Sequence, residues 1–163
     1  MSELVQNTIL DFYENPVYIM VGIPGSGKST WIKNNLGNIN IVSRDIIRAE
    51  LGFTTDENEK VVLDKKDEAL VTKVEYDYIR KYCAKNVPFV IDDTNTGKYR
   101  KELINVLRKY NRFIIGINMH TPLDVCIERR KGQIPAKIMK QIYQNKQYID
   151  ESEVDKVINV SGI

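Results

Sequence analysis

The sequence contains little of the material from which disulfide frameworks and zinc sites are built. Its 163 residues include two cysteines, Cys83 and Cys126, and a single histidine, His120. Two cysteines cannot make the network of cross-links that holds a small secreted scaffold, and these three residues are poor material for a structural zinc site. Such cysteine usage is typical of a reducing compartment, and we expect a cytoplasmic location.

Long apolar runs and a large excess of one charge are missing as well. No apolar run approaches the roughly 18 residues that a membrane-spanning helix requires, so we expect no membrane association. The first ten residues lack the basic and apolar regions of a secretory signal. The 24 Lys and Arg against 22 Asp and Glu give a net charge of +2, which argues against a basic coat protein or an acidic disordered tail.

What is present is the composition of an ordinary globular protein, with 42% hydrophobic and 28% charged residues. The length suits one domain, so we expect residues 1–163 to form a single unit. Positive charge is nevertheless concentrated, because residues 98–146 hold 12 Lys and Arg but 3 Asp and Glu. This excess indicates either one positive surface or helix faces that simply carry lysines.

Short β-branched segments alternate with amphipathic ones along the chain. Strands are expected at residues 17–21, 39–42, 87–91, 113–119 and 157–160. Helices are expected at residues 29–36, 46–51, 97–110, 122–130 and 135–149, with one long helix or two shorter ones within 56–85. Thr121 is a candidate N-cap for the helix that begins at Pro122. The alternation predicts an α/β fold with a central parallel sheet of four to five strands flanked by helices.

One segment matches the pattern G-x-x-x-x-G-K-[ST] and lies between an expected buried strand and an expected helix. It reads Gly22-Ile23-Pro24-Gly25-Ser26-Gly27-Lys28-Ser29. Glycines let consecutive backbone N–H groups turn toward a polyphosphate, and the following helix points its own N–H groups at the same anion. Lys28 would bridge the β- and γ-phosphates, and the Ser29 hydroxyl would ligate Mg²⁺. We therefore predict that ATP or another nucleoside triphosphate, with Mg²⁺, is bound by Gly22, Pro24, Gly25, Ser26, Gly27, Lys28, Ser29 and Thr30.

Acidic residues follow two of the expected strands, at the edge where ligands bind in open α/β sheets. Asp45 comes shortly after the strand at 39–42, where its carboxylate could take the proton of an attacking hydroxyl. Arg48 lies one helical turn later and could hold an acceptor phosphate by two hydrogen bonds. The alternative interpretation makes Asp45 a helix N-cap and Arg48 a solvated side chain.

Asp92 and Asp93 end the apolar strand at 87–91 in the manner of an acid that holds Mg²⁺ directly or through water. Successive strand residues point to opposite faces, so one of them should face the metal while the other orients Arg48 or the acceptor. We take Asp92 as the candidate metal ligand and Asp93 as a candidate catalytic residue, although the residues themselves leave this choice open.

Basic residues beside a glycine, Arg129 and Arg130 ahead of Gly132, suit a short lid over the triphosphate. One of these arginines would stabilise charge on the transferred group, and the sequence does not choose between them. A solvated basic turn is the alternative. Another charged segment is interpreted as a solvated helix face and contains Asp56, Glu57, Glu59, Asp64, Asp67 and Glu68.

The segments GIPGSGKSTW, SRDIIR and VIDDTN, followed by a basic lid and a Pro-led helix, resemble the kinase domain of polynucleotide 5′-hydroxyl kinases of the phage and bacterial nucleic-acid-repair type. The resemblance spans residues 17–148 and implies a P-loop kinase fold. It implies that Lys28 and Ser29 bind ATP phosphates and Mg²⁺ and that Asp45 activates the 5′-hydroxyl. Arg48 would hold the phosphate next to the terminal nucleotide.

The same resemblance assigns the two aspartates and the lid. Asp93 matches the essential acid of the D-T-N segment in phage members, and Asp92 matches the acid that some bacterial members carry one place earlier. Arg130, in preference to Arg129, would contact the ATP phosphates, although the lid is shorter than in the family. Many members also carry a 3′-phosphatase with a D-x-D-G-T signature, which this sequence lacks, so we expect a single kinase domain without a phosphatase.

The implied partner is single-stranded or end-exposed DNA or RNA with a 5′-hydroxyl, and the sequence does not choose between the two nucleic acids or predict an oligomeric state. Two other functions stay open. A small-molecule kinase of the same architecture, acting on a nucleoside, a sugar acid or a similar metabolite, would use the same loop, acid and lid. A nucleotide-gated binding module would bind ATP tightly and phosphorylate no acceptor.

Overall fold

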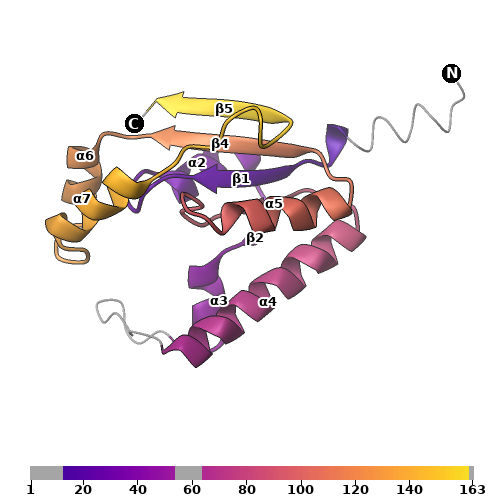
Figure 1. The fold of residues 1–163 in the computed structure, drawn as a ribbon, viewed down its shortest axis with the longest axis horizontal. Helices are drawn as coiled ribbons and strands as arrows, with labels where there is room; N and C mark the ends of the chain where they lie inside the picture. Colours follow the sequence, from indigo (N-terminus) through magenta and orange to yellow (C-terminus); the bar gives the residue numbers. More distant parts are fainter. Residues whose placement is uncertain (1–12, 54–63, 162–163) are drawn as a thin grey trace, which may run out of the picture.

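The computed structural model describes residues 13–53 and 64–161, which build a parallel sheet with helices on both faces (Figure 1). The strands are β1 (Val17–Val21), β2 (Asn40–Val42), β3 (Phe89–Ile91), β4 (Ile114–His120) and β5 (Lys156–Ser161). The helices are α2 (Lys28–Leu36), α3 (Arg44–Glu50), α4 (Lys65–Ala84), α5 (Arg100–Lys109), α6 (Leu123–Arg129) and α7 (Ala136–Asn145). The predicted α/β fold with a parallel sheet of four to five strands is confirmed, and the sheet has five.

The sheet has the strand order β2-β3-β1-β4-β5, and every neighbouring pair is parallel. β1 lies in the centre, where Val17 is in register with Phe89 on one side and Ile114 on the other. The loop after β1 therefore emerges between the ends of its two neighbours. In open parallel sheets this edge is where ligands bind.

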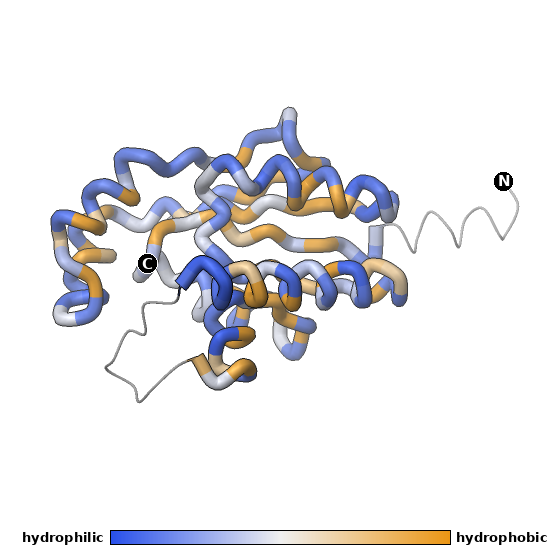
Figure 2. Tube along the Cα trace, turned by 60° about the horizontal axis from the view of Figure 1, so that its bottom comes forward, coloured by the Kyte–Doolittle hydropathy of each residue, from blue (hydrophilic) through white to orange (hydrophobic). Residues whose placement is uncertain are grey.

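Alternate residues of the central strands supply two hydrophobic cores. Val17, Ile19 and Phe89 face α4 and α5, where they pack with residues such as Val71 and Leu107. Met20, Val90 and Ile117 face α2 and pack with Ile32 and Trp31. In Figure 2 the hydrophobic colouring accordingly gathers on the strands, while the helices carry much hydrophilic colouring. The strands are buried on both faces, as their continuous apolar runs predict.

Helix ends differ from the sequence prediction by up to four residues, and two of the differences have a clear structural cause. α7 ends at Asn145 instead of Ile149, because the Asn118 side chain binds both the backbone N–H and the carbonyl of Ile149. Ile149 then packs onto Gly116, where a Cβ would lie 2.4 Å from its side chain. The prediction of Thr121 as an N-cap is also wrong, because its hydroxyl donates to the Ser26 carbonyl at 2.6 Å. The part of the predicted 56–85 helix that falls on residues 56–63 lies outside the described residues.

Two of the basic residues in 98–146 are buried and form hydrogen bonds inside the protein. Arg100 is buried and donates to the carbonyls of Asn95 and Gln147 and to Glu153. Arg112 is buried and donates to three backbone carbonyls. The remaining basic residues of this segment include those of the lid and α7. Within the described ranges, no helix combines the length and apolar character needed to cross a bilayer.

Candidate active site

The loop between β1 and α2 has the backbone geometry of a phosphate cradle. Gly25 and Gly27 adopt φ values of +82° and +93°, which favour glycine. A Cβ at Gly25 would lie 2.9 Å from the Cys126 carbonyl oxygen of α6, so this contact requires glycine as well. Gly22 is buried behind the loop, where its N–H donates to the Thr94 carbonyl at 3.0 Å. The loop is thus held between α6 and the segment that follows β3, and α2 begins directly after it.

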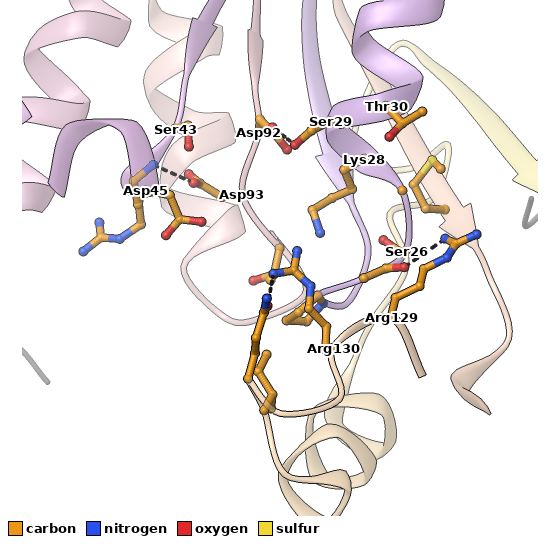
Figure 3. Close-up of a pocket in the computed structure, with 18 of the residues that line it drawn as sticks. Ser26, Lys28, Ser29, Thr30, Ser43, Asp45, Asp92, Asp93, Arg129 and Arg130 are labelled. Carbon is orange, nitrogen blue, oxygen red and sulfur yellow. Dashed lines mark hydrogen bonds between the residues drawn. The ribbon is translucent and has the colours of Figure 1, made fainter. Parts of the chain in front are cut away.

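Lys28 and Ser29 begin α2 and face the pocket (Figure 3). The Lys28 Nζ donates to the carbonyls of Gly22 at 3.0 Å and Ile23 at 3.1 Å, so the ammonium lies over the loop. Burial lowers the pKa of Lys28, with a further decrease from Arg130 and an opposing increase from Asp92. The loop thus holds a cation inside the cradle, the arrangement that a polyphosphate needs.

Asp92 and Asp93 at the end of β3 have separate partners. The Ser29 hydroxyl donates to Asp92 Oδ2 at 2.8 Å, whereas Asp93 Oδ1 accepts the backbone N–H of Arg44 at 2.9 Å. A hydroxyl and a carboxylate in contact are hard oxygen ligands of the kind that Mg²⁺ prefers, so Ser29 and Asp92 fit a magnesium site. Burial and the nearby carboxylates of Glu75 and Asp92 raise the pKa of Asp93 to about 7.

Asp45 lies on α3, across the pocket from the phosphate loop (Figure 3). Arg48 follows one turn later on the same helix and also lines the pocket. Ser43, and not Asp45, is the N-cap of this helix, because its side chain accepts the N–H of Ile46. The Arg48 Nη1 donates to Asp45 Oδ1 at 2.9 Å, and 93% of the Asp45 side chain is exposed. The structure therefore places a solvent-accessible carboxylate beside a guanidinium on the wall that faces Lys28.

Arg48 is not oriented by either aspartate of β3, contrary to one sequence expectation. Its second partner is Glu68, in the first turn of α4, through Nε and Nη2 at 3.2 Å each. The interpretation of Glu68 as part of a solvated helix face is wrong. Glu68, Thr72 and Glu75 recur every three to four residues along α4 and all contact Arg44, so this polar stripe was the available signal in the sequence.

The lid joins α6 to α7 and turns at Gly132, where φ is +83°. The Arg129 Nη1 donates to the Gly25 carbonyl at 3.0 Å, and Arg130 donates to Gln133 at 3.2 Å. Figure 3 shows both arginines at the lid side of the pocket, with Arg129 next to Ser26. Both lie within reach of the loop, and the geometry does not favour one over the other as a ligand of the transferred group.

One cavity of about 1110 Å³ brings these groups together. It is lined by the phosphate loop from Pro24 to Thr30, and by Asp45, Arg48, Asp92, Asp93, Arg129 and Arg130. Of the predicted site residues only Gly22 is absent from this lining. The sequence did not single out Asn34, Ile46, Met119, Gln133 and Ile134, which also line the cavity. The volume slightly exceeds the roughly 300–1,000 Å³ typical of ligand pockets, which leaves room for a nucleotide and an acceptor.

Several solved structures share this fold. A protein of Chloroflexus aurantiacus provisionally designated a kinase has a TM-score of 0.69 and 15% identity, over 90% of this chain and 85% of that chain. A sugar kinase from Janibacter sp. has a TM-score of 0.59 and 15% identity over the same shares. A chain of the Pnkp1/Rnl/Hen1 complex has a TM-score of 0.60 and 22% identity, over 71% of this chain and 38% of that chain.

A match to a family model shows which family the chain belongs to, which the structural similarities do not. Identities of 15% to 22% show the fold alone. The model of the family described as "AAA domain" matches residues 17–155, which include the phosphate loop, the acidic strand ends and the lid. Enzymes of this type use ATP or another nucleoside triphosphate, typically with Mg²⁺. The chain belongs to this AAA domain family and has the fold of the P-loop kinases.

Proposed function

We propose that the protein is a polynucleotide 5′-hydroxyl kinase, which transfers the γ-phosphoryl group of ATP to the 5′-hydroxyl end of DNA or RNA. The observation that carries this proposal is the exposed Asp45–Arg48 pair in the wall opposite Lys28. A carboxylate suits a hydroxyl that must lose its proton, and the adjacent guanidinium suits a neighbouring phosphate. The terminal nucleotide of a 5′-hydroxyl strand offers both groups, because its own 3′-phosphate follows the reacting hydroxyl.

The donor side holds the triphosphate through the loop N–H groups and Lys28. Mg²⁺, when bound, would neutralise charge on the β- and γ-phosphates, and Ser29 with Asp92 would hold it. Asp45 takes the proton of the 5′-hydroxyl as its oxygen forms the bond to the γ-phosphorus. The bond from that phosphorus to the β-phosphate oxygen breaks, ADP leaves, and Lys28 with a lid arginine offsets the charge that develops.

A basic surface beside the lid supports a nucleic-acid acceptor. Residues 129–149 contain six Lys and Arg and no Asp or Glu. Lys137 and Lys140 are exposed on α7, one helical turn apart, and Lys131 is exposed in the lid. Contacts of such residues with phosphates are independent of base sequence and weaken as salt rises. The strand beyond its terminal nucleotide would lie along this surface, which we call the α7 basic face (Lys131, Lys137 and Lys140).

A small-molecule kinase is the second candidate, and a specific observation favours it. The similar structures include the Janibacter sugar kinase and a gluconokinase from Sinorhizobium meliloti, which has a TM-score of 0.52 and 18% identity. Arg48 could bind the carboxylate of a sugar acid in place of a phosphate. Such an enzyme would have no use for the α7 basic face, which is why we rank it second.

The test is transfer of label from γ-labelled ATP, with Mg²⁺, to separate acceptors. These are 5′-hydroxyl DNA and RNA oligonucleotides, gluconate and a nucleoside mixture, with Lys28→Ala as the inactive control. Label at the oligonucleotide 5′ end supports the proposal, and the DNA to RNA ratio gives its preferred substrate. Label in gluconate or a nucleoside alone overturns it in favour of the second candidate. ATP binding without a labelled acceptor favours a nucleotide-gated binding module.

A further inference from the structure

Arg48 has two carboxylate partners that differ in geometry and exposure. The Glu68 carboxylate accepts two hydrogen bonds from one edge of the guanidinium, from Nε and Nη2 at 3.2 Å each. Asp45 takes the remaining terminal nitrogen, Nη1, at 2.9 Å. The Asp45 side chain is 93% exposed and the Glu68 side chain 37%. The Asp45 contact is therefore open to competition from an incoming anion, whereas the Glu68 contact is more sheltered.

Glu68 is itself held by a second arginine, Arg44. Arg44 Nη2 donates to Glu68 Oε2 at 2.7 Å, and Arg44 Nη1 donates to Thr72 and Glu75 at 3.0 Å each. Burial acts to raise the pKa of Glu68, but the hydrogen bonds from Arg48 and Arg44 outweigh it and lower that pKa. Glu68 thus remains an anion held between two arginines, and it ties α4 to the helix that carries Asp45.

We propose that Glu68 is a positioning residue that sets acceptor specificity: it holds Arg48 by the Nε–Nη2 edge and presents Nη1 to the pocket, where an acceptor phosphate replaces Asp45. This inference rests on the proposed function. The exchange separates the Asp45 carboxylate from its cationic partner as the acceptor arrives. A hydroxyl compound that carries no neighbouring anion cannot displace Asp45 from Arg48, so the ion pair stays intact. The arrangement therefore favours acceptors that carry a phosphate.

A double-mutant cycle on acceptor binding tests this role without requiring turnover. Adenosine 3′-phosphate is titrated into wild type, Glu68→Gln, Arg48→Gln and the double variant, and the dissociation constant is measured by calorimetry. The control is Asp77→Asn, which removes one negative charge from the same helix at an exposed position. Thermal unfolding checks that each variant is folded, and Glu68→Asp replaces Glu68→Gln where it is not.

We expect Glu68→Gln to weaken binding of adenosine 3′-phosphate about tenfold, equivalent to about 1.4 kcal/mol, with ATP affinity unchanged. In the Arg48→Gln background the same change should have less than about a twofold effect, because Glu68 acts through Arg48. Additive effects, an equal loss of ATP affinity, or the same loss in Asp77→Asn would overturn the inference. If the wild type labels a sugar acid instead of a nucleotide, the proposed function fails, and the same cycle run on that sugar acid still decides the role of Glu68.

Discussion

Replacing Asp45 by asparagine should separate catalysis from folding and from nucleotide binding. The substitution keeps the shape of the side chain and removes the proton acceptor. The Asp45 side chain is 93% exposed, and the contact that the structure gives it is the ion pair with Arg48. Exposed ion pairs contribute little to stability, so the midpoint of thermal unfolding should stay within about 3 °C of the wild type. Neither Lys28 nor Ser29 depends on this carboxylate, so ATP affinity should not change.

The chemical step should respond much more strongly than stability. A general base contributes about 10²–10⁴-fold to the rate, so kcat for transfer to a 5′-hydroxyl oligonucleotide should fall by that factor. The assay is steady-state transfer from γ-labelled ATP at saturating acceptor, together with calorimetric ATP binding and a melting curve. Asp77→Asn on α4 serves as the matched charge control. A kcat within about fivefold of the wild type would refute the role of Asp45 as the base.

Three further predictions follow from the site and the surface beside it. Ser29→Ala should raise the Mg²⁺ concentration needed for half-maximal transfer by about tenfold, and Asp92→Asn should do the same, because the two side chains are in contact at 2.8 Å. An unchanged Mg²⁺ requirement would contradict the assignment of these residues as metal ligands. The folded-state pKa of Asp93, about 7, lies above its ordinary value of 3.8, so the contribution of Asp93 to stability without Mg²⁺ should be lost as pH rises from 4 to 7. The melting temperature of the wild type relative to Asp93→Asn should therefore fall over this range, and an unchanged difference between the two proteins would be the contrary result. Lys137→Glu with Lys140→Glu should raise the KM of a long oligonucleotide severalfold but not that of adenosine 3′-phosphate, and equal effects on both would remove α7 from the strand path.

The sequence predicted those features that depend on short stretches of chain. The phosphate loop is one continuous segment whose glycines and lysine are each required locally, and the structure gives Gly25 and Gly27 positive φ values. Asp45 and Arg48 are three residues apart on a helix, so their contact follows from helix geometry. The buried parallel strands were likewise evident from continuous apolar runs.

Features that depend on how distant segments pack could not be predicted. The contacts between Glu68 and Arg48 require α4 to lie against α3. The polar stripe on α4 indicates a polar neighbour, but it does not identify that neighbour as α3. The early end of α7 depends on Asn118, a residue of β4 that holds the backbone of Ile149. Thr121 had the local pattern of an N-cap, but a loop nearly one hundred residues earlier offered its hydroxyl a buried carbonyl.

The measurement that bears most directly on the central claim compares two acceptors that differ by one phosphate. The ratio of kcat/KM for adenosine 3′-phosphate to that for adenosine, with ATP and Mg²⁺ saturating, reports whether the group beside the reacting hydroxyl is recognised. We expect adenosine 3′-phosphate to be preferred by at least about 100-fold, because Arg48 would otherwise remain paired with Asp45. Equal values for the two acceptors, or transfer to gluconate in preference to both, would contradict the account.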